Sequence, residues 1–183
     1  MTLPDTEVPF AEEPKWPVEV DRPVIVLIDA SSNLERRLME AWIDRNLPEG
    51  TTAEPVCIPA SRRRRRGCRI DPGLEARMGR DDDPVLVPLR IAWLAPQRDG
   101  ARSVRLADLL KLGDPRDPDL LRQYLILARA PDRCRILVGE PASSSELTAL
   151  WPEGVESSSL SEFVARRAWL ALERAERQVR GNR

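Results

Sequence analysis

The feature that most constrains this fold is the apolar run at residues 85–94, the longest strand-like segment of the sequence. Turn-forming residues bound it on both sides, and its hydrophobic residues do not alternate regularly with polar ones. Such a run is typical of a strand whose two faces are both covered by other elements. Because Pro88 has no amide hydrogen to donate to a neighbouring strand, we expect a bulge there, with residues 85–87 and 89–94 pairing with different neighbours.

Shorter strand-like segments alternate with helical ones along the rest of the chain. Runs rich in valine, isoleucine and leucine predict strands, and apolar residues at a spacing of three to four predict helices. This alternation predicts an α/β fold with a mainly parallel sheet and flanking helices. The expected strands lie at residues 24–28, 56–58 and 135–139, and the expected helices at about 33–48, 71–78, 117–131, 143–151 and 159–181.

Three of the expected helices begin with a serine followed three residues later by a glutamate. This spacing predicts a capping box, in which each side chain satisfies an otherwise unpaired backbone amide. The three pairs are Ser32 with Glu35, Ser143 with Glu146, and Ser159 with Glu162.

Periodicity also predicts which face is buried in two of the helices. One begins at Asp117-Pro118, because an acid before a proline is a common helix start. The C-terminal helix carries an apolar stripe along its length. We expect its Leu172, Ala175 and Val179 to face away from the body, towards another domain. The residues expected to be buried are Leu121, Tyr124, Leu125 and Ala128 in the first helix, and Leu160, Phe163, Val164 and Ala168 in the near half of the second.

The sequence divides into three parts. Residues 1–22 are acidic and rich in proline and predict a flexible tail, residues 23–155 predict the α/β domain, and residues 156–183 predict a long helix. Residues 154–158 have the composition of a hinge. No segment approaches the ~20 apolar residues that a membrane-spanning helix needs, and no signal peptide is recognisable. We therefore expect a cytoplasmic protein.

Composition excludes several kinds of chemistry. The 183 residues include no histidine, so a Ser-His-Asp triad and a Cys-His pair are impossible. The cysteines at 57, 68 and 134 are widely spaced, which supports neither a disulfide framework nor a zinc site. A net charge of −1 gives no overall attraction to nucleic acid. We expect no catalytic residue, no metal, no cofactor and no nucleic-acid partner for this chain, and the oligomeric state stays open.

Two turns hold polar residues of the kinds that bind ligands. The turn at residues 29–33 joins a buried strand to a helix start, where many α/β proteins bind phosphate. It lacks the glycines that allow close approach to the backbone, so a plain connecting turn is favoured. Asp81, Asp82 and Asp83 could supply carboxylates to a divalent ion. Because consecutive side chains of an extended segment point in different directions, a solvated turn is favoured here too.

A run of five arginines is the sharpest local charge feature. The first interpretation is a solvated loop. The second is contact with anionic lipid, worth ~1 kcal/mol per basic residue near the surface, and the third is contact with nucleic-acid phosphates. No aromatic residue interleaves with the run, which argues against base stacking. The arginines are Arg62, Arg63, Arg64, Arg65 and Arg66.

Three segments together carry a resemblance to a known family. They are DPVLVPLRIAWLAPQRDG at residues 83–100, RILVGEPA at residues 135–142 and FVARRAWLALERAER at residues 163–177. The first is similar to an apolar strand and a charged, glycine-containing loop in the N-terminal region of bacterial glycerol-3-phosphate acyltransferases. The other two resemble later segments of that region in their expected order. The likeness covers the sequence from about residue 24 onward.

The resemblance implies an enzyme of phospholipid synthesis that acylates position 1 of glycerol 3-phosphate, with the histidine of a His-x-x-x-x-Asp motif as general base. A chain without histidine cannot contain that motif. The resemblance therefore implies a non-catalytic N-terminal domain at the cytoplasmic face of the membrane. Its partners would be the catalytic acyltransferase domain of the full-length chain and an anionic membrane surface. The alternative is a free-standing α/β module that binds a nucleotide or phosphorylated metabolite at residues 29–33.

Overall fold

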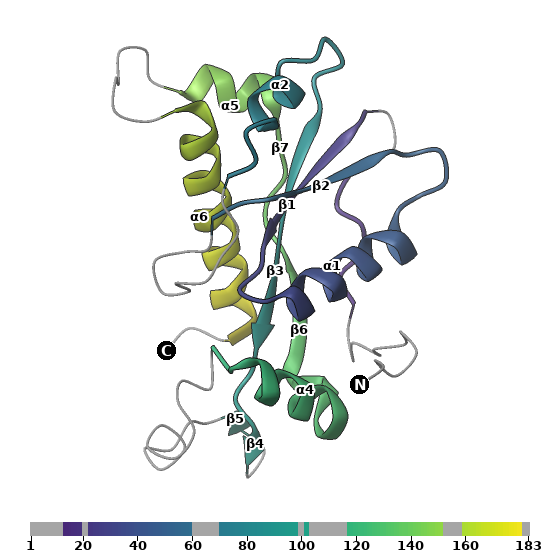
Figure 1. The fold of residues 1–183 in the computed structure, drawn as a ribbon, viewed down its shortest axis with the longest axis vertical. Helices are drawn as coiled ribbons and strands as arrows, with labels where there is room; N and C mark the ends of the chain where they lie inside the picture. Colours follow the sequence, from purple (N-terminus) through teal and green to yellow (C-terminus); the bar gives the residue numbers. More distant parts are fainter. Residues whose placement is uncertain are drawn as a thin grey trace.

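The protein has an α/β fold, as the sequence predicts, built on a mixed sheet with the strand order β2-β1-β3-β6 (Figure 1). The computed structural model describes residues 13–19, 22–59, 70–98, 101–102, 117–151 and 159–180. β1 is parallel to both β2 and β3, whereas β6 and β7 are antiparallel to β3. The strands are β1 (Val24–Asp29), β2 (Ala53–Cys57), β3 (Val85–Trp93), β6 (Cys134–Val138) and β7 (Ala142–Ser143), with a separate hairpin of β4 (Gln97–Arg98) and β5 (Ala101–Arg102).

Helices cover both faces of the sheet, which explains why apolar residues do not alternate in β3. α1 and α4 pack on one face, and α2, α5 and α6 pack on the other (Figure 1). Along β1, Val26 and Ile28 share a core with Trp42 of α1, whereas Ile25 and Leu27 belong to the core of the opposite face. The helices are α1 (Asn33–Asn46), α2 (Leu74–Met78), α4 (Leu120–Arg129), the 3-10 turn η1 (Pro131–Arg133), α5 (Ser144–Leu150) and α6 (Leu160–Arg180).

β3 is the central strand, and its proline does not produce the expected bulge. The register with β1 runs without interruption, and Leu27 lies opposite Pro88. On its other side β3 pairs with β7 at Val85 and Leu86 and with β6 from residue 89 onward, so the expected change of neighbour is confirmed. The missing amide faces the connection between β6 and β7, where the carbonyl of Pro88 accepts a hydrogen bond from the Gly139 amide at 2.8 Å. A donor is therefore not needed at this position.

Part of the expected N-terminal tail lies against α1. The ring of Trp16 stacks on that of Trp42, with 5.7 Å between their centroids. Glu13 accepts a hydrogen bond from Arg45 at 2.7 Å. The described residues 13–19 thus extend the core on the α1 face of the sheet.

The capping boxes expected at α5 and α1 differ in how many of their two hydrogen bonds form. At α5 the box is complete, since the Ser143 hydroxyl accepts from the Glu146 amide at 3.2 Å and the Glu146 carboxylate accepts from the Ser143 amide at 2.9 Å. At α1 the hydroxyl of Ser32 accepts from the amide of Glu35, but the carboxylate of Glu35 accepts from the amide of Ser31 instead. The expected box is therefore wrong in its second half, because Glu35 is drawn into the core (below).

Helix α4 is oriented differently from the prediction. Its N-cap is Asp119, which accepts from the Arg122 amide at 3.0 Å, two residues beyond the expected start at Asp117. Its buried residues are Gln123 and Ile126. The helix carries apolar residues on most of its own sides, so their spacing alone does not indicate which face is buried. Of the four residues expected to be buried, Leu121, Leu125 and Ala128 are exposed and Tyr124 is half-buried.

Helix α6 lies along the sheet over β3 and β6 (Figure 1). Val164 and Ala168 are buried as expected. Leu172 was expected to face away from the body, but it is fully buried, which corrects that expectation, while Val179 is exposed. The expected hinge at residues 154–158 lies outside the described residues.

Candidate functional site

The turn after β1 was the sequence's candidate for a phosphate site. Asp29, its first residue, is buried at the carboxyl end of β1 and lies directly opposite Arg90 of β3. The Nε of Arg90 donates to Oδ2 of Asp29 at 2.7 Å. Ligands of α/β proteins bind at this edge of the sheet, so here the protein's own ion pair occupies the usual position.

The ion pair continues into α6. A second guanidinium nitrogen of Arg90 lies 3.2 Å from the carboxylate of Glu176. Arg180 lies 2.6 Å from the same carboxylate and also donates to the carbonyl oxygen of Trp93 at 3.3 Å. Because a buried charge is costly without its partner, this cluster ties the C-terminal half of α6 to the centre of the sheet.

A second buried carboxylate, that of Glu35, lies on the other side of the turn. Glu35 is fully buried, and it accepts from the indole of Trp93 and from the amide of Ser31, both at 2.7 Å. The amide of Gln123 also donates to it, at 3.4 Å. An incoming phosphate would meet this carboxylate in place of a free backbone amide. The geometry does not favour anion binding at residues 29–33.

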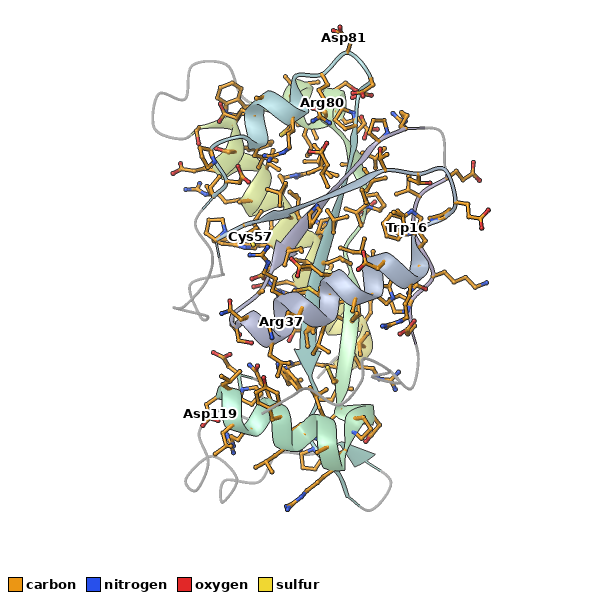
Figure 2. The ribbon with its side chains drawn as sticks, turned by 45° about the vertical axis from the view of Figure 1, so that its right-hand side comes forward. Trp16, Arg37, Cys57, Arg80, Asp81 and Asp119 are labelled. Atoms are coloured by element: carbon orange, nitrogen blue, oxygen red, sulfur yellow. The ribbon has the colours of Figure 1, made fainter. Side chains whose placement is uncertain are left out.

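The three consecutive aspartates do not converge. Asp83 has a left-handed backbone with φ 43°, and it accepts from the amide and the hydroxyl of Ser145 at 2.8 and 2.9 Å. The Ser145 amide, with Arg22 nearby, lowers the pKa of Asp83. Asp81 projects from the tip of the turn into solvent (Figure 2). Across the described ranges, no group of three or more histidine, cysteine, aspartate or glutamate residues is arranged to hold a metal ion.

The remaining polar candidates are the arginine run and the cysteines. Arg62, Arg63, Arg64, Arg65 and Arg66 lie outside the described residues, and so does Cys68. Cys134 is buried, and this burial, together with the negative charge of Glu35, raises the pKa of its thiol. A thiol held in its neutral form is a poor nucleophile.

The cavity that the sequence did not reveal is an open cleft between α5 and α6, with a volume of about 530 Å³. Its floor is the sheet at β3, and its far wall is the connection between β6 and β7. This volume lies within the range of about 300–1,000 Å³ that is common for ligand pockets. The floor contains Leu86 and Pro88, the walls contain Leu147, Leu150, Ala168, Leu170 and Ala171, and the rim contains Glu140, Arg167 and Arg174.

Gly139 lets α6 approach the floor of this cleft. A Cβ atom at this position would lie 3.0 Å from Cβ of Pro88 and 3.1 Å from Cβ of Ala171. Both contacts are tighter than those of an ordinary side chain, so a larger residue would push α6 away from β3. The glycine was visible in the sequence, but its role depends on two segments that only the fold brings together.

The cleft is lined mainly by apolar side chains. Its described lining offers no hydroxyl, thiol or imidazole group. Arg174 and Glu140 face each other across the rim at 4.0 Å, and both are well exposed. Leu150 and Leu170 are exposed on opposite walls, so apolar surface is open to a partner. None of the described helices combines the length and the apolar character needed to cross a bilayer.

Comparison with known proteins does not assign the chain to a family. No protein-family model matches the sequence, and no solved structure matches the fold.

Proposed function

We propose that this chain is the non-catalytic N-terminal domain of a bacterial glycerol-3-phosphate 1-O-acyltransferase, which acts in the synthesis of phosphatidic acid at the membrane. The proposal is supported by how the fold brings together the segments that carry the resemblance. The three segments that resemble that family, at residues 83–100, 135–142 and 163–177, form β3, β6 and most of α6. These elements pack against one another and together line the cleft.

The contacts between the three segments are specific. Arg90 of the first lies opposite Leu137 of the second and contacts Glu176 of the third at 3.2 Å. Gly139 of the second segment fits between Pro88 of the first and Ala171 of the third. Each segment thus needs the other two, which supports the interpretation that their joint resemblance reflects one structural unit.

A non-catalytic role follows from the composition. The chemistry implied by the resemblance needs a histidine as general base, and the chain has none. The catalytic acyltransferase domain of the full-length chain would therefore supply the reaction. The cleft, with exposed Leu150 and Leu170 on its walls, is the surface on which that domain would pack.

The same proposal includes the location of the protein and its second partner. Arg62 to Arg66 would contact anionic lipid at the cytoplasmic face of the cell membrane, at ~1 kcal/mol per residue. The chain itself would need no cofactor. The alternative, a free-standing module that binds a nucleotide or phosphorylated metabolite, is less favoured, because Asp29 and Glu35 place two buried carboxylates at the turn it would use.

The test is a chimera in which this chain replaces the N-terminal region of an active bacterial glycerol-3-phosphate acyltransferase. We expect the chimera to form 1-acylglycerol 3-phosphate from glycerol 3-phosphate and an acyl thioester, and we expect the chain alone to form none. The double substitution Leu150→Arg with Leu170→Arg should lower the activity of the chimera at least tenfold, because it places two charges against the docked domain.

Asp44→Arg is the control for the added charge, because Asp44 is an exposed residue of α1, on the opposite face of the sheet from the cleft. The isolated cleft variant should melt at the wild-type temperature, since both leucines are exposed. Turnover by the chain alone that survives repurification would overturn the proposal. So would a chimera that is inactive although it folds and reaches the membrane.

A further inference from the structure

Helix α4 presents exposed leucines to solvent. Three large aliphatic side chains of this 10-residue helix are exposed, with Leu120 at 51%, Leu121 at 68% and Leu125 at 43%. A helix of a globular domain normally turns its apolar stripe to the core. Leucines gathered on one exposed helix, rather than scattered singly, therefore mark an interaction surface.

The exposed stripe has cationic and aromatic borders. Leu121 and Leu125 are four residues apart, so they lie one above the other on the same side of the helix. At 3.6 residues per turn, Arg122 and Arg129 fall along one edge of this stripe, and Tyr124 falls along the other. No carboxylate occurs within the helix, so its own charge is positive.

The helix cannot turn these leucines inward, because its buried side is fixed by hydrogen bonds. The Gln123 amide donates to the carbonyl of Pro118 at 3.0 Å and to the carboxylate of Glu35 at 3.4 Å, and its oxygen accepts from Ser32 at 2.7 Å. Ile126 packs into the core beside it. Rotation of α4 would leave these polar groups buried without partners, at a cost of about 1–3 kcal/mol for each group.

We infer that the exposed face of α4 docks onto an anionic membrane surface. A short amphipathic helix of this kind lies in the plane of the interface, with its leucines among the upper acyl chains and its arginines against anionic headgroups. Tyrosine is favoured at the same depth. The complementary charge argues for lipid. So does the size of the face, since one side of a helix about 15 Å long falls short of the ~800 Å² per partner of a stable protein interface.

The experiment measures cosedimentation of the full chain with vesicles of phosphatidylcholine, with and without phosphatidylglycerol. Leu121→Gln with Leu125→Gln should lower partitioning onto the mixed vesicles by about tenfold or more, which corresponds to about 1.4 kcal/mol. Arg122→Gln with Arg129→Gln should lower it about fivefold per arginine. The arginine substitutions should leave the weaker binding to pure phosphatidylcholine unchanged.

Leu150→Gln with Leu170→Gln is the matched control, because these leucines are as exposed but lie on the cleft, and it should bind like the wild type. Equal binding of the α4 variant and the control would overturn the inference. A dimer that dissociates in the α4 variant, without vesicle binding by either form, would show that a second copy covers the face. A marked drop in the melting temperature of the α4 variant would show that residues 103–116 of the chain itself cover it. This test needs no catalytic domain, so its failure is distinct from failure of the acyltransferase proposal.

Discussion

Helices α4 and α6 look alike in sequence, but they meet the protein in opposite ways. Both carry apolar residues at helical spacing and arginines beside them. In α6 the stripe through Val164, Ala168 and Leu172 is buried against the sheet, whereas in α4 the stripe through Leu121 and Leu125 faces solvent. Apolar spacing therefore identifies a helix more reliably than it identifies the side that is buried.

Buried polar groups account for the difference. α6 is held to β3 by Arg90, whose guanidinium joins Glu176 to the buried carboxylate of Asp29. α4 is held through the amide of Gln123, which reaches the buried carboxylate of Glu35. In α6 the polar anchor lies beside the apolar stripe, and in α4 it lies on the opposite side. In each helix, a polar side chain that would lose its buried hydrogen-bond partners on rotation therefore fixes which side of the helix faces the core.

The largest effect that would test this comparison is expected at Leu172. Leu172→Ala removes a fully buried side chain between α6 and the sheet, and we expect the free energy of unfolding to fall by about 2–5 kcal/mol. Urea denaturation followed by far-UV circular dichroism measures the change. Leu170→Ala, on the exposed side of the same helix, is the control. A loss below the control's would mean that the C-terminal half of α6 does not pack on this domain.

The sequence could predict most of the sheet and the buried side of α6 at Val164 and Ala168, because local signals and tertiary packing agree there. The β-branched run at residues 24–28 and the complete capping box at Ser143 needed no information beyond their own segments. The absence of a bulge at Pro88 could not be predicted, because it depends on Gly139 lying beside it. The cleft could not be predicted either, because its floor, walls and rim come from segments that are distant in sequence.

The polar sites were predictable only in part, for the same reason. A plain turn was favoured at residues 29–33, but nothing local indicated that Asp29 would pair with Arg90. Asp83 was expected to be solvated, yet it accepts hydrogen bonds from Ser145 at the start of α5. Asp81, in contrast, is exposed at the tip of the turn. Long-range partners of polar side chains leave little trace in a single sequence.

An intermediate effect is expected at the anchor of α4. Gln123→Ala leaves Ser32 without its partner at 2.7 Å and removes a donor from buried Glu35, so we expect a loss of about 1–3 kcal/mol in the free energy of unfolding. The exposed glutamine of α6, Gln178→Ala, is the control and should lose less than about 0.5 kcal/mol. An unchanged midpoint in the Gln123 variant would show that α4 is oriented by its apolar contacts alone.

The smallest effect is expected at Leu121, which belongs to the apolar stripe of α4 as Leu172 belongs to the apolar stripe of α6. Leu121→Ala removes a side chain that already lies mostly in water, and alanine is the better helix former, so the free energy of unfolding should change by less than about 0.5 kcal/mol. The measurement is the same urea titration used for Leu172→Ala, with the two variants side by side. Matching midpoints for Leu121→Ala and the wild type would mean that this leucine contributes nothing inside the free domain and is available to a partner. A loss approaching that of Leu172→Ala would mean instead that both stripes are buried, and the contrast between the two helices would disappear.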